Sequence, residues 1–471
     1  ILDLSFLHRI FRSYMYQIGT MKKIYSLLLI LFAGDIVNGQ SNPPCIPCLP
    51  QGITFTTQSQ IDSFQINYPN CTQVEGNLRI SGNDITNLNG LSGLTSIGGN
   101  FFILSCHNLS SLTGLNNVNS IGGDFILSDN ESLTSMSGLD TLSSIGGYLS
   151  LDYNIGLTSL TGLDNLVSIG EDCFISFCFS LTNLTGLGSL NSIGGGLYIS
   201  SDTSLVSLLG MDSLTTFGNL LISYCNALTC MDGLNYISSI TGAIELYGNN
   251  SLSNLAGLEN LYSIGGWLYV NSNPVLNSLS GLTNVNSIGQ IFICSNNSLT
   301  NIIDLMNVNS TGGNLVICDN NNLTSLSGLD NIEPNSIVSL TISYNAVLSS
   351  CAVAGICEYL ASPNCIVDIS NNDTGCSTVE EVKDSCGITS VSYLNPESLL
   401  NIYPNPAIDN ITLETTSKGS LSIHNISGQL LIQHEITEQT TTVDVSGLKS
   451  GVYLVKVVGT NSTQVGKVIK Q

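Results

Sequence analysis

The chain has 471 residues, of which only 10% are charged, with 46 glycines and a formal net charge of −23 at pH 7. So small a charged fraction argues against a disordered acidic polymer and indicates that apolar surface is buried. Between Thr72 and Asn345 the only cationic side chain is Arg79. Because phosphate binding needs clustered Lys and Arg, we expect no nucleic acid as a partner of this region.

The N-terminal region contains two segments that we exclude from the fold. Residues 1–20 begin with Ile and share no pattern with the rest of the chain, so we interpret them as upstream sequence or a misassigned start. Residues 21–39 are typical of a secretory signal peptide, because Lys22 and Lys23 precede an apolar stretch at 24–33 and small residues precede the cut. The alternative is an uncleaved membrane anchor. Since no other apolar run approaches the ~20 residues of a spanning helix, we expect no transmembrane span in the mature chain.

The 15 cysteines fall into three groups, and export lets them form lasting disulfides. Three lie in residues 40–71, interpreted as an N-terminal cap, five lie in residues 346–387, a Cys-rich C-terminal cap, and seven lie between the caps. The spacing Cys45-x-x-Cys48 also occurs in metal and redox sites, but there is no second pair with zinc-finger spacing and no His nearby. We therefore expect disulfides that clamp the caps.

Residues 72–345 consist of one sequence repeated about twelve times. Ser-Ile-Gly begins at Ser144 and returns at Ser168, a period of 24 residues (168 − 144). A fixed period of this length indicates a solenoid, whose coils pack on their neighbours. Each unit contains apolar-x-apolar-x-x-Asn, as in residues 149–154 (Leu-Ser-Leu-Asp-Tyr-Asn). Alternation with period two over so few residues predicts a short strand with one face inward.

The last position of this pattern is nearly always Asn or Cys. A buried backbone group without a partner costs about 1–3 kcal/mol, and a stacked Asn amide can donate to one coil and accept from the next. Cys is small and has a weak S–H donor, so it is a tolerated substitute. We expect a buried structural ladder made of Asn83, Cys106, Asn130, Asn154, Cys178, Asp202, Cys225, Asn249, Asn273, Asn296, Asn320 and Asn345.

This pattern resembles that of leucine-rich repeat proteins, Leu-x-x-Leu-x-Leu-x-x-Asn/Cys. The Gly-Gly pairs at 98–99, 122–123 and 146–147, and the opening at 70–80 (Asn-Cys-x-x-Val-x-Gly-Asn-Leu-x-Ile), also resemble the receptor L-domain relatives of that fold. The resemblance implies a mainly β fold, a right-handed parallel β-solenoid of about twelve coils of 23–25 residues. It carries little information on function, because the matching residues are structural.

The second half of each unit places Leu at intervals of three, as at Leu157, Leu160, Leu163 and Leu166. With the recurring Gly, Ser, Thr and Asn, this spacing favours an extended or 3₁₀-like return path over a full helix. Since strands stack about 4.8 Å apart, twelve coils would form a rod or arc of roughly 55 Å around a column of Leu and Ile.

If Leu149 and Leu151 face inward, the residue between them and its counterparts form an outward row on the sheet. This row and its neighbour are rich in aromatic side chains, and contiguous exposed apolar area tends to mark an interaction site. The resemblance implies the same, because leucine-rich repeat proteins bind ligands on this face. The alternative is that aromatic residues merely favour strands and pair across them. The candidate ligand-binding residues are Phe102, Tyr148, Phe174, Tyr198, Trp267, Tyr269 and Phe292.

The cysteines within the repeats divide by their positions in the pattern. Cys106, Cys178 and Cys225 stand at the ladder position and Cys173 at an inward strand position, so we interpret all four as buried free thiols. Cys294 and Cys318 are equivalent positions on adjacent coils. A disulfide between them is possible, although one across neighbouring strands is often strained.

We expect no catalytic residue, no metal and no cofactor. The four histidines are His8, His107, His424 and His434. With one of them in the solenoid, a Ser-His-Asp triad or a His-based zinc site has almost no candidates. Carboxylates such as Asp124, Asp129 and Asp152 leave a polysaccharide-degrading β-helix enzyme or a Ca²⁺ site as alternatives. The enzyme would use Lys or Arg nearby, which are absent, and the Ca²⁺ site lacks motif spacing.

After a polar linker at 388–399, residues 400–471 alternate short strand-like segments with turns, which predicts a small β-sandwich. Four motifs stand there in order: Tyr403-Pro404-Asn405-Pro406, Asn425-x-x-Gly428, Gly451-Val-Tyr453 and Lys467-Val-Ile-Lys470. In their kind and order they resemble the C-terminal sorting domain of the type IX secretion system of Bacteroidetes-type bacteria.

This second resemblance implies passage through the inner membrane, recognition of residues 400–471 by the type IX machinery, and cleavage in the linker with release or surface attachment. We therefore predict an exported protein, secreted or held at the outer-membrane cell surface, that binds a glycan or a protein through the sheet face and is not an enzyme. The rival hypotheses are the polysaccharide-degrading enzyme and a purely structural surface protein.

Overall fold

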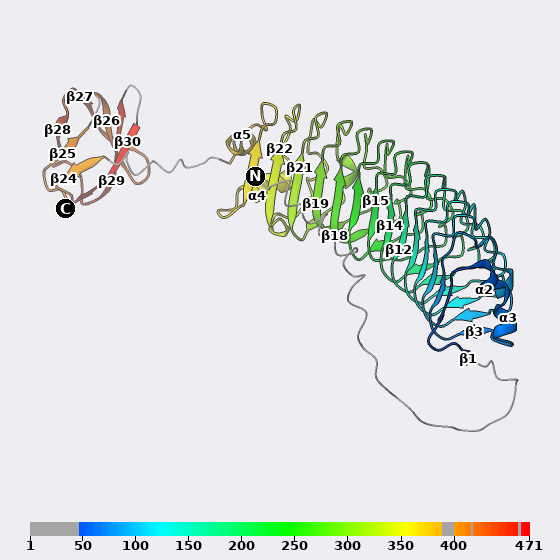
Figure 1. Ribbon diagram of the computed structural model, residues 1–471. Coiled ribbons are helices and arrows are strands. Elements are labelled where there is room, and N and C mark those ends of the chain that lie inside the picture. Colours follow the sequence, from blue (N-terminus) through cyan, green and yellow to red (C-terminus); the bar gives the residue numbers. More distant parts are fainter. Residues whose placement is uncertain (1–46, 389–399, 416–417, 460–462) are drawn as a thin grey trace, which may run out of the picture.

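The computed structural model describes residues 47–388, 400–415, 418–459 and 463–471. The protein is mainly β, and two groups of strands each enclose a core of their own (Figure 1). Residues 1–20, the predicted signal peptide and the linker from 389 onward lie outside the described residues. No helix within the described ranges is long and apolar enough to cross a membrane.

The main sheet of the solenoid contains one parallel strand from each coil. Its fourteen successive strands are β2 (Ile53–Phe55), β4 (Leu78–Ile80), β6 (Phe101–Leu104), β8 (Phe125–Ser128), β10 (Leu149–Asp152), β12 (Cys173–Ser176), β14 (Leu197–Ser200), β15 (Leu220–Ser223), β17 (Ile244–Tyr247), β18 (Ser263–Asn271), β19 (Ser287–Cys294), β21 (Asn314–Cys318), β22 (Ser339–Ser343) and β23 (Val367–Ser370). Neighbours pair in register, so that Ser150 lies beside Phe174. The solenoid is confirmed, and it extends by β2 and β23 into both predicted caps.

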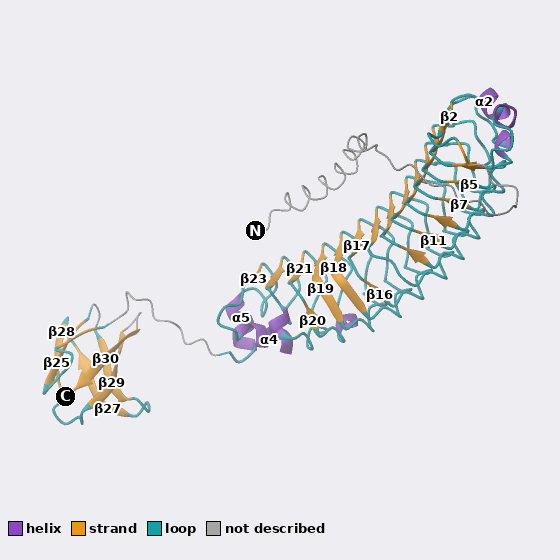
Figure 2. Ribbon diagram, turned by 90° about the horizontal axis from the view of Figure 1, so that it is seen from below, coloured by secondary structure: helices purple, strands orange, loops and turns teal. Residues whose placement is uncertain are grey.

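A second row of short parallel strands lies at the position that most repeats fill with Ser-Ile. It contains β1 (Pro47–Cys48), β3 (Gln73–Val74), β5 (Ser96–Ile97), β7 (Ser120–Ile121), β9 (Ser144–Ile145), β11 (Ser168–Ile169) and β13 (Ser192–Ile193), while β16 (Ser239–Ile240) and β20 (Ser310–Thr311) join the main sheet through β18 and β19. Figure 2 shows the array as an arc with the main sheet along its inner side. The return path is made of turns and the short 3₁₀ pieces η2 (Asn89–Leu91), η3 (Ile303–Leu305) and η4 (Pro334–Ser336).

One continuous apolar core runs through all coils of the solenoid. The leucines spaced by three, such as Leu157 and Leu160, are fully buried, and each contributes about 1.5–3 kcal/mol relative to exposure. Gly162, two residues after Leu160, allows the return path to pass close to the preceding coil. Gly162 has φ 110°, and a Cβ there would collide with the carbonyl of Met136 in the preceding coil.

Short helices and disulfides close the two ends of the core. At the N-terminal end lie α2 (Gln58–Asp62), α3 (Phe64–Asn67) and the disulfide Cys48–Cys71. At the C-terminal end lie α4 (Ala354–Leu360), α5 (Val379–Ser385) and the disulfides Cys351–Cys376 and Cys357–Cys386. Disulfides therefore clamp both caps.

The cysteines within the repeats separate into one disulfide and a set of thiols. Cys294 and Cys318 are register partners on β19 and β21 and form a disulfide. The free thiols of Cys106, Cys173, Cys178 and Cys225 are buried, whereas those of Cys230 and Cys365 are partly exposed. Burial raises the pKa of the Cys173 and Cys225 thiols to about 12.

We predict that iodoacetamide at pH 8 alkylates Cys230 in the native protein and alkylates Cys173 and Cys225 only after unfolding. The thiolate is the nucleophile, and a buried thiol with a raised pKa supplies almost none of it. Peptide mass mapping before and after denaturation measures the labelling of each residue. Equal native labelling of Cys230 and Cys173 would contradict the buried positions.

The C-terminal domain is a sandwich of two antiparallel sheets, as predicted. One sheet contains β24 (Asn401–Tyr403), β25 (Asn410–Glu414) and β28 (Thr440–Asp444), and the other contains β26 (Gly419–Asn425), β27 (Leu430–Ile436), β29 (Gly451–Gly459) and β30 (Thr463–Lys470). The inward residues of the alternating strands, such as Ile411, Leu421 and Val455, fill the space between the sheets.

Candidate functional site

The ladder position connects successive coils through buried Asn side chains. Oδ1 of Asn154 accepts from the backbone N–H of Asn130 at 3.1 Å, and its Nδ2 donates to the carbonyl of Leu127 at 2.8 Å. The same arrangement recurs at Asn249, Asn273, Asn296, Asn320 and Asn345. Asn372, which the sequence pattern does not include, continues the row by accepting from the N–H of Asn345 at 3.0 Å. This row is structural and buried, so it holds no ligand.

The structure corrects the prediction for Asn83, which is exposed. In the next coil two residues separate the ladder residue Cys106 from the core residue Leu109. The same spacing counted back from Ile85 falls on Gly82. Because the first coil is one residue shorter between β4 and this core position, Asn83 lies outside the row.

Asp202 is the one carboxylate at the ladder position. It is fully buried, and its Oδ1 accepts from the N–H of Cys178 at 2.6 Å. Its Oδ2 is also buried and has no hydrogen-bond partner among the described residues. Burial raises the pKa of Asp202 to about 7. A carboxylate thus occupies a place where an amide could both accept and donate.

The predicted outward row lies on the solvent side of the main sheet. Six of its seven candidate residues are half-buried, and Trp267 is 42% exposed. The rings of Tyr148 and Phe174 lie 6.0 Å apart edge to face, and those of Phe174 and Tyr198 stack at 4.9 Å. Tyr269 and Phe292 form a second pair at 6.4 Å. Phe102 is separated from both groups, so the sheet brings the candidates together as two clusters and a single ring.

A carboxylate belongs to the second cluster. Nε1 of Trp267 donates to Glu245 at 3.1 Å. Burial raises the pKa of Glu245, and burial together with neighbouring Tyr247 and Glu245 raises the pKa of Tyr269 to about 12. Tyr224 packs edge to face on Tyr247 at 5.1 Å, so this part of the sheet combines aromatic surface with one hydrogen-bonding carboxylate.

A further set of aromatic residues lies beside the outward row and was not predicted. Tyr153, Phe177 and Tyr224 precede ladder residues and have φ of 54°, 55° and 57°. Bulky residues rarely adopt this left-handed conformation, which costs of order 1–3 kcal/mol. The rings of Tyr153 and Phe177 stack at 4.4 Å, and Phe179 contacts Phe177 at 6.1 Å. Their place just before the Asn/Cys position was the signal available in the sequence.

A second polar row, also missed, lies where the main strands begin. Oδ1 of Asn77 accepts from the N–H of Asn100 at 2.8 Å, and Oδ1 of Asn100 accepts from the N–H of Asp124 at 2.9 Å. Asp124 then accepts from the N–H of Tyr148 at 3.2 Å. The row connects the coil starts as the ladder connects the coil ends, and burial raises the pKa of Asp124.

Among the carboxylates considered for catalysis, strand β8 separates Asp124 from Asp129, whereas Asp129 and Asp152 lie side by side on adjacent coils, where the N–H of Asp129 donates to the carbonyl of Asp152 at 3.0 Å. The side chain of Asp152 accepts from the hydroxyl of Ser176 at 2.6 Å. Among the described residues, one group of three metal-ligand types comes together, formed by His107, Asp129 and Glu131, with Nε2 of His107 3.8 Å from Oδ2 of Asp129. All three are exposed or half-exposed, and the group resembles an ordinary surface ion pair.

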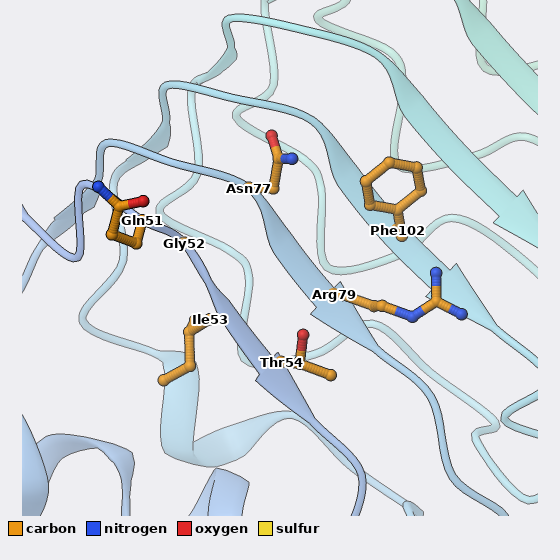
Figure 3. A pocket seen from close by; sticks show the side chains of 7 residues that line it. All are labelled: Gln51, Gly52, Ile53, Thr54, Asn77, Arg79 and Phe102. Carbon is orange, nitrogen blue, oxygen red and sulfur yellow. The ribbon is translucent and has the colours of Figure 1, made fainter. Parts of the chain in front are cut away.

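A hollow of about 290 Å³ lies at the N-terminal end of the main sheet. It is lined by Gln51, Gly52, Ile53, Thr54, Asn77, Arg79 and Phe102. Figure 3 shows Thr54, Arg79 and Phe102 on three neighbouring strands, with Gln51 and Asn77 just before strands β2 and β4. The hollow therefore joins one candidate aromatic residue, Phe102, to the only cation of the repeats.

The sorting-signal residues are tied together by the sandwich. Asn405, which lies between two cis prolyl bonds, donates through Nδ2 to the carbonyl of Lys467 at 2.7 Å and accepts at Oδ1 from the N–H of Ile469 at 2.9 Å. The first and last motifs of the domain thus form one cluster. The other motif residues are placed as follows along the domain. The hydroxyl of Tyr403 donates to Glu414, and that of Tyr453 donates to the carbonyl of Lys449. Gly428 lies in a turn at φ 80° and Gly451 begins β29, while Pro404 and Pro406 flank Asn405 and Lys470 ends β30.

Comparison with known proteins supports the predictions for both the solenoid and the C-terminal domain. Residues 53–150 and 95–229 match the BspA type leucine rich repeat region, in six copies, and residues 401–471 match the secretion system C-terminal sorting domain. The curated proteins contain no match. Among solved structures, the chain is similar to InlP of Listeria monocytogenes, with 15% identity over 89% of this chain and 88% of that chain, and a TM-score of 0.17. The resemblance to receptor L domains stays a prediction.

The repeat sequence and the solenoid agree with the first match, and the motif cluster around Asn405 agrees with the second. The sorting domain marks proteins that the type IX system exports. Residues 53–229 therefore match leucine-rich repeats of the BspA type, residues 401–471 form a type IX C-terminal sorting domain, and the protein is secreted or at the cell surface.

Proposed function

We propose that the solenoid is a binding module without catalytic activity, and that it recognises a glycan or a protein through the solvent-facing side of its main sheet. The sorting domain implies contact between residues 401–471 and the type IX machinery, which brings the solenoid to the cell exterior. A binding role for the solenoid is consistent with that location.

The observation that carries this proposal is the run of aromatic contacts across adjacent coils. The ring of Phe174 contacts those of Tyr148 and Tyr198 on the two neighbouring coils, and all three side chains remain half-exposed. Aromatic pairs of this kind contribute about 0.5–1.5 kcal/mol beyond area burial, which explains some of their presence structurally. Trp267 differs, because it is exposed and its indole N–H is held by Glu245.

The electrostatics of the face agree with an uncharged or weakly charged ligand. Across the outward row the charged residues are Arg79, Glu245 and Asp368, on widely separated coils. Such a surface favours stacking on flat apolar faces with a few hydrogen bonds, as in the aromatic cores of protein interfaces. Sugar rings and extended peptides both offer this combination.

We predict that replacing Trp267, Tyr269 and Phe292 together with Ser weakens ligand binding at least tenfold. Truncation of central aromatic residues removes the contacts that usually dominate an interface. The ligand is first identified with the full chain on a glycan array and in a pull-down of host proteins. Affinity for that ligand and the thermal unfolding midpoint are then measured for the variant and the parent.

The matched control replaces Tyr236 and Tyr262 with Ser. These tyrosines are 62% and 50% exposed but lie on the return path, away from the outward row. Their loss should leave affinity unchanged. Binding retained in the triple variant despite lowered stability would contradict the proposal, turnover of a polysaccharide would favour the enzyme, and failure to find any saturable ligand would favour a purely structural protein.

A further inference from the structure

We infer that the hollow around Arg79 binds the carboxylate of an acidic sugar, such as a uronic acid unit. This inference rests on the proposed function and specifies one ligand class for one end of the sheet. It concerns β2, β4 and β6, which lie far along the array from Trp267 and Tyr269.

Arg79 occupies an unusual place for a cation. It lies on the solvent side of β4, between Thr54 of β2 and Phe102 of β6 in the strand register. Its side chain is exposed, and its guanidinium has no ion pair or hydrogen bond to any residue in the part of the chain that the structure describes. In a chain of net charge −23, a cation that contacts none of the carboxylates in the described ranges is available to an external anion.

The residues around Arg79 add donors and contribute no competing carboxylate. Gln51 and Asn77 supply amide N–H groups, Thr54 supplies a hydroxyl, and none of the seven lining residues is acidic. Oδ1 of Asn77 accepts from the N–H of Asn100, and its Nδ2 has no protein partner among the described residues. A guanidinium binds a carboxylate through two parallel hydrogen bonds, which gives geometric specificity as well as affinity.

The size and charge of the hollow favour one sugar acid over other anions. A volume of about 290 Å³ lies just below the usual range of ligand sites, about 300–1,000 Å³, so it suits a single ring. One cation matches one carboxylate, whereas nucleic acids need clustered Lys and Arg. The Phe102 ring offers an apolar wall for the C–H face of a sugar, and the amides and hydroxyl suit its OH groups.

The test titrates the full chain with D-galacturonate and D-glucuronate, and with D-galactose and D-glucose as their neutral matches. Binding is followed by calorimetry or ligand-observed NMR. We expect each acid that binds to exceed its neutral match at least tenfold in affinity and to weaken as salt rises, because exposed charges are screened. Arg79→Gln should reduce acid binding at least tenfold, and Arg79→Lys should restore only part of it because Lys lacks the paired donors.

The matched control is Lys383→Gln, which removes the same charge from the C-terminal cap and should leave binding unchanged. Unchanged thermal midpoints for both variants would show that the fold is intact. Equal affinity for acid and neutral sugars, acid binding that survives Arg79→Gln, or no acid binding at all would overturn the inference. A peptide carboxylate that binds while all sugar acids fail would overturn the sugar assignment. Loss of this site would leave the Trp267 test of the proposed function untouched.

Discussion

Replacing Asp202 with Asn is expected to stabilise the solenoid by about 4 kcal/mol at pH 8 and to have little effect near pH 3.5. The folded pKa of Asp202 is about 7, against about 3.9 in an unfolded chain, so the folded state holds the proton more tightly. Below the unfolded pKa both states are protonated and no penalty arises. As pH rises from about 4 to about 7, the cost of keeping the charged Asp202 carboxylate buried grows and lowers the stability of the parent. Above that range this cost is complete, at ~1.4 kcal/mol per unit of difference between the folded and unfolded pKa.

The geometry gives the same direction independently of the titration. An Asn at 202 would supply the Nδ2 donor that Asn154 and Asn249 direct to the carbonyl 27 residues earlier. Here that carbonyl belongs to Ile175. Neutral Asp202 can donate from its protonated oxygen, whereas the charged form can only accept.

Chemical or thermal unfolding from pH 3.5 to 8 measures this effect as the difference between variant and parent, which cancels the pH dependence of the remaining carboxylates. Two further variants sharpen the comparison. Asp212→Asn, at an exposed position, should match the parent at every pH. Asn154→Asp should introduce a new loss of stability above pH 4. A pH-independent effect of Asp202→Asn would refute the buried, unpaired carboxylate.

Replacing Asn273 with Ala is expected to lower stability by about 4 kcal/mol. Oδ1 of Asn273 accepts from the N–H and Nδ2 of Asn249 at 3.0 and 3.3 Å, and its Nδ2 donates to the carbonyl of Leu246 at 3.0 Å. Ala would remove this partner from the buried N–H of Asn249 and from the buried carbonyl of Leu246, at about 1–3 kcal/mol each, and would open a small cavity, while Nδ2 of Asn249 would keep its bond to Ile222. Water cannot easily compensate, because the position is fully buried.

Hydrogen exchange at the amide of Asn249, together with the thermal midpoint, measures this loss, because a solenoid can open locally without unfolding entirely. The control is Asn260→Ala. Asn260 also donates to a neighbouring coil, to the carbonyl of Asn235 at 2.6 Å, but the bond is exposed. Its removal should change stability by no more than about 0.5 kcal/mol. Equal losses in the two variants would show that burial does not set the strength of the ladder.

Most of the fold was predictable from the repeat, because each coil has the same pattern of apolar and polar residues. The apolar-x-apolar pattern locates the strands, and the Asn or Cys after it locates the ladder, so residues such as Asn130 and Leu149 were predictable by position alone. The exposed position of Asn83 was not predictable, because the first coil lacks one residue after its strand, although the apolar-x-apolar-x-x-Asn pattern is still present there. The strand β2 was hidden for a related reason, since its coil contains helices α2 and α3 in place of the repeated return path.

The candidate site was predictable only in part. The alternation of apolar and other residues along the strands predicted that Tyr198 and Trp267 lie on the solvent side of the sheet. It carried no information on the left-handed backbone conformation of Tyr153 or Phe177. The bond between Trp267 and Glu245 joins residues of adjacent coils, and the choice of partner depends on side-chain rotamers. The hollow at Arg79 needs Gln51 and Thr54 from the coil that the repeat pattern did not reach.

The ladder also divides the arc into two mechanically different parts. From Asn249 through Asn273, Asn296, Asn320 and Asn345 to Asn372, each side-chain amide bonds the next without interruption. Toward the N-terminus, Cys and Asp residues interrupt the row, and among the described coils before Asn249 only Asn130 and Asn154 form such a bonded amide pair. Under tension we therefore expect the half that carries Phe174 and Tyr198 to bend more easily than the half that carries Trp267 and Tyr269.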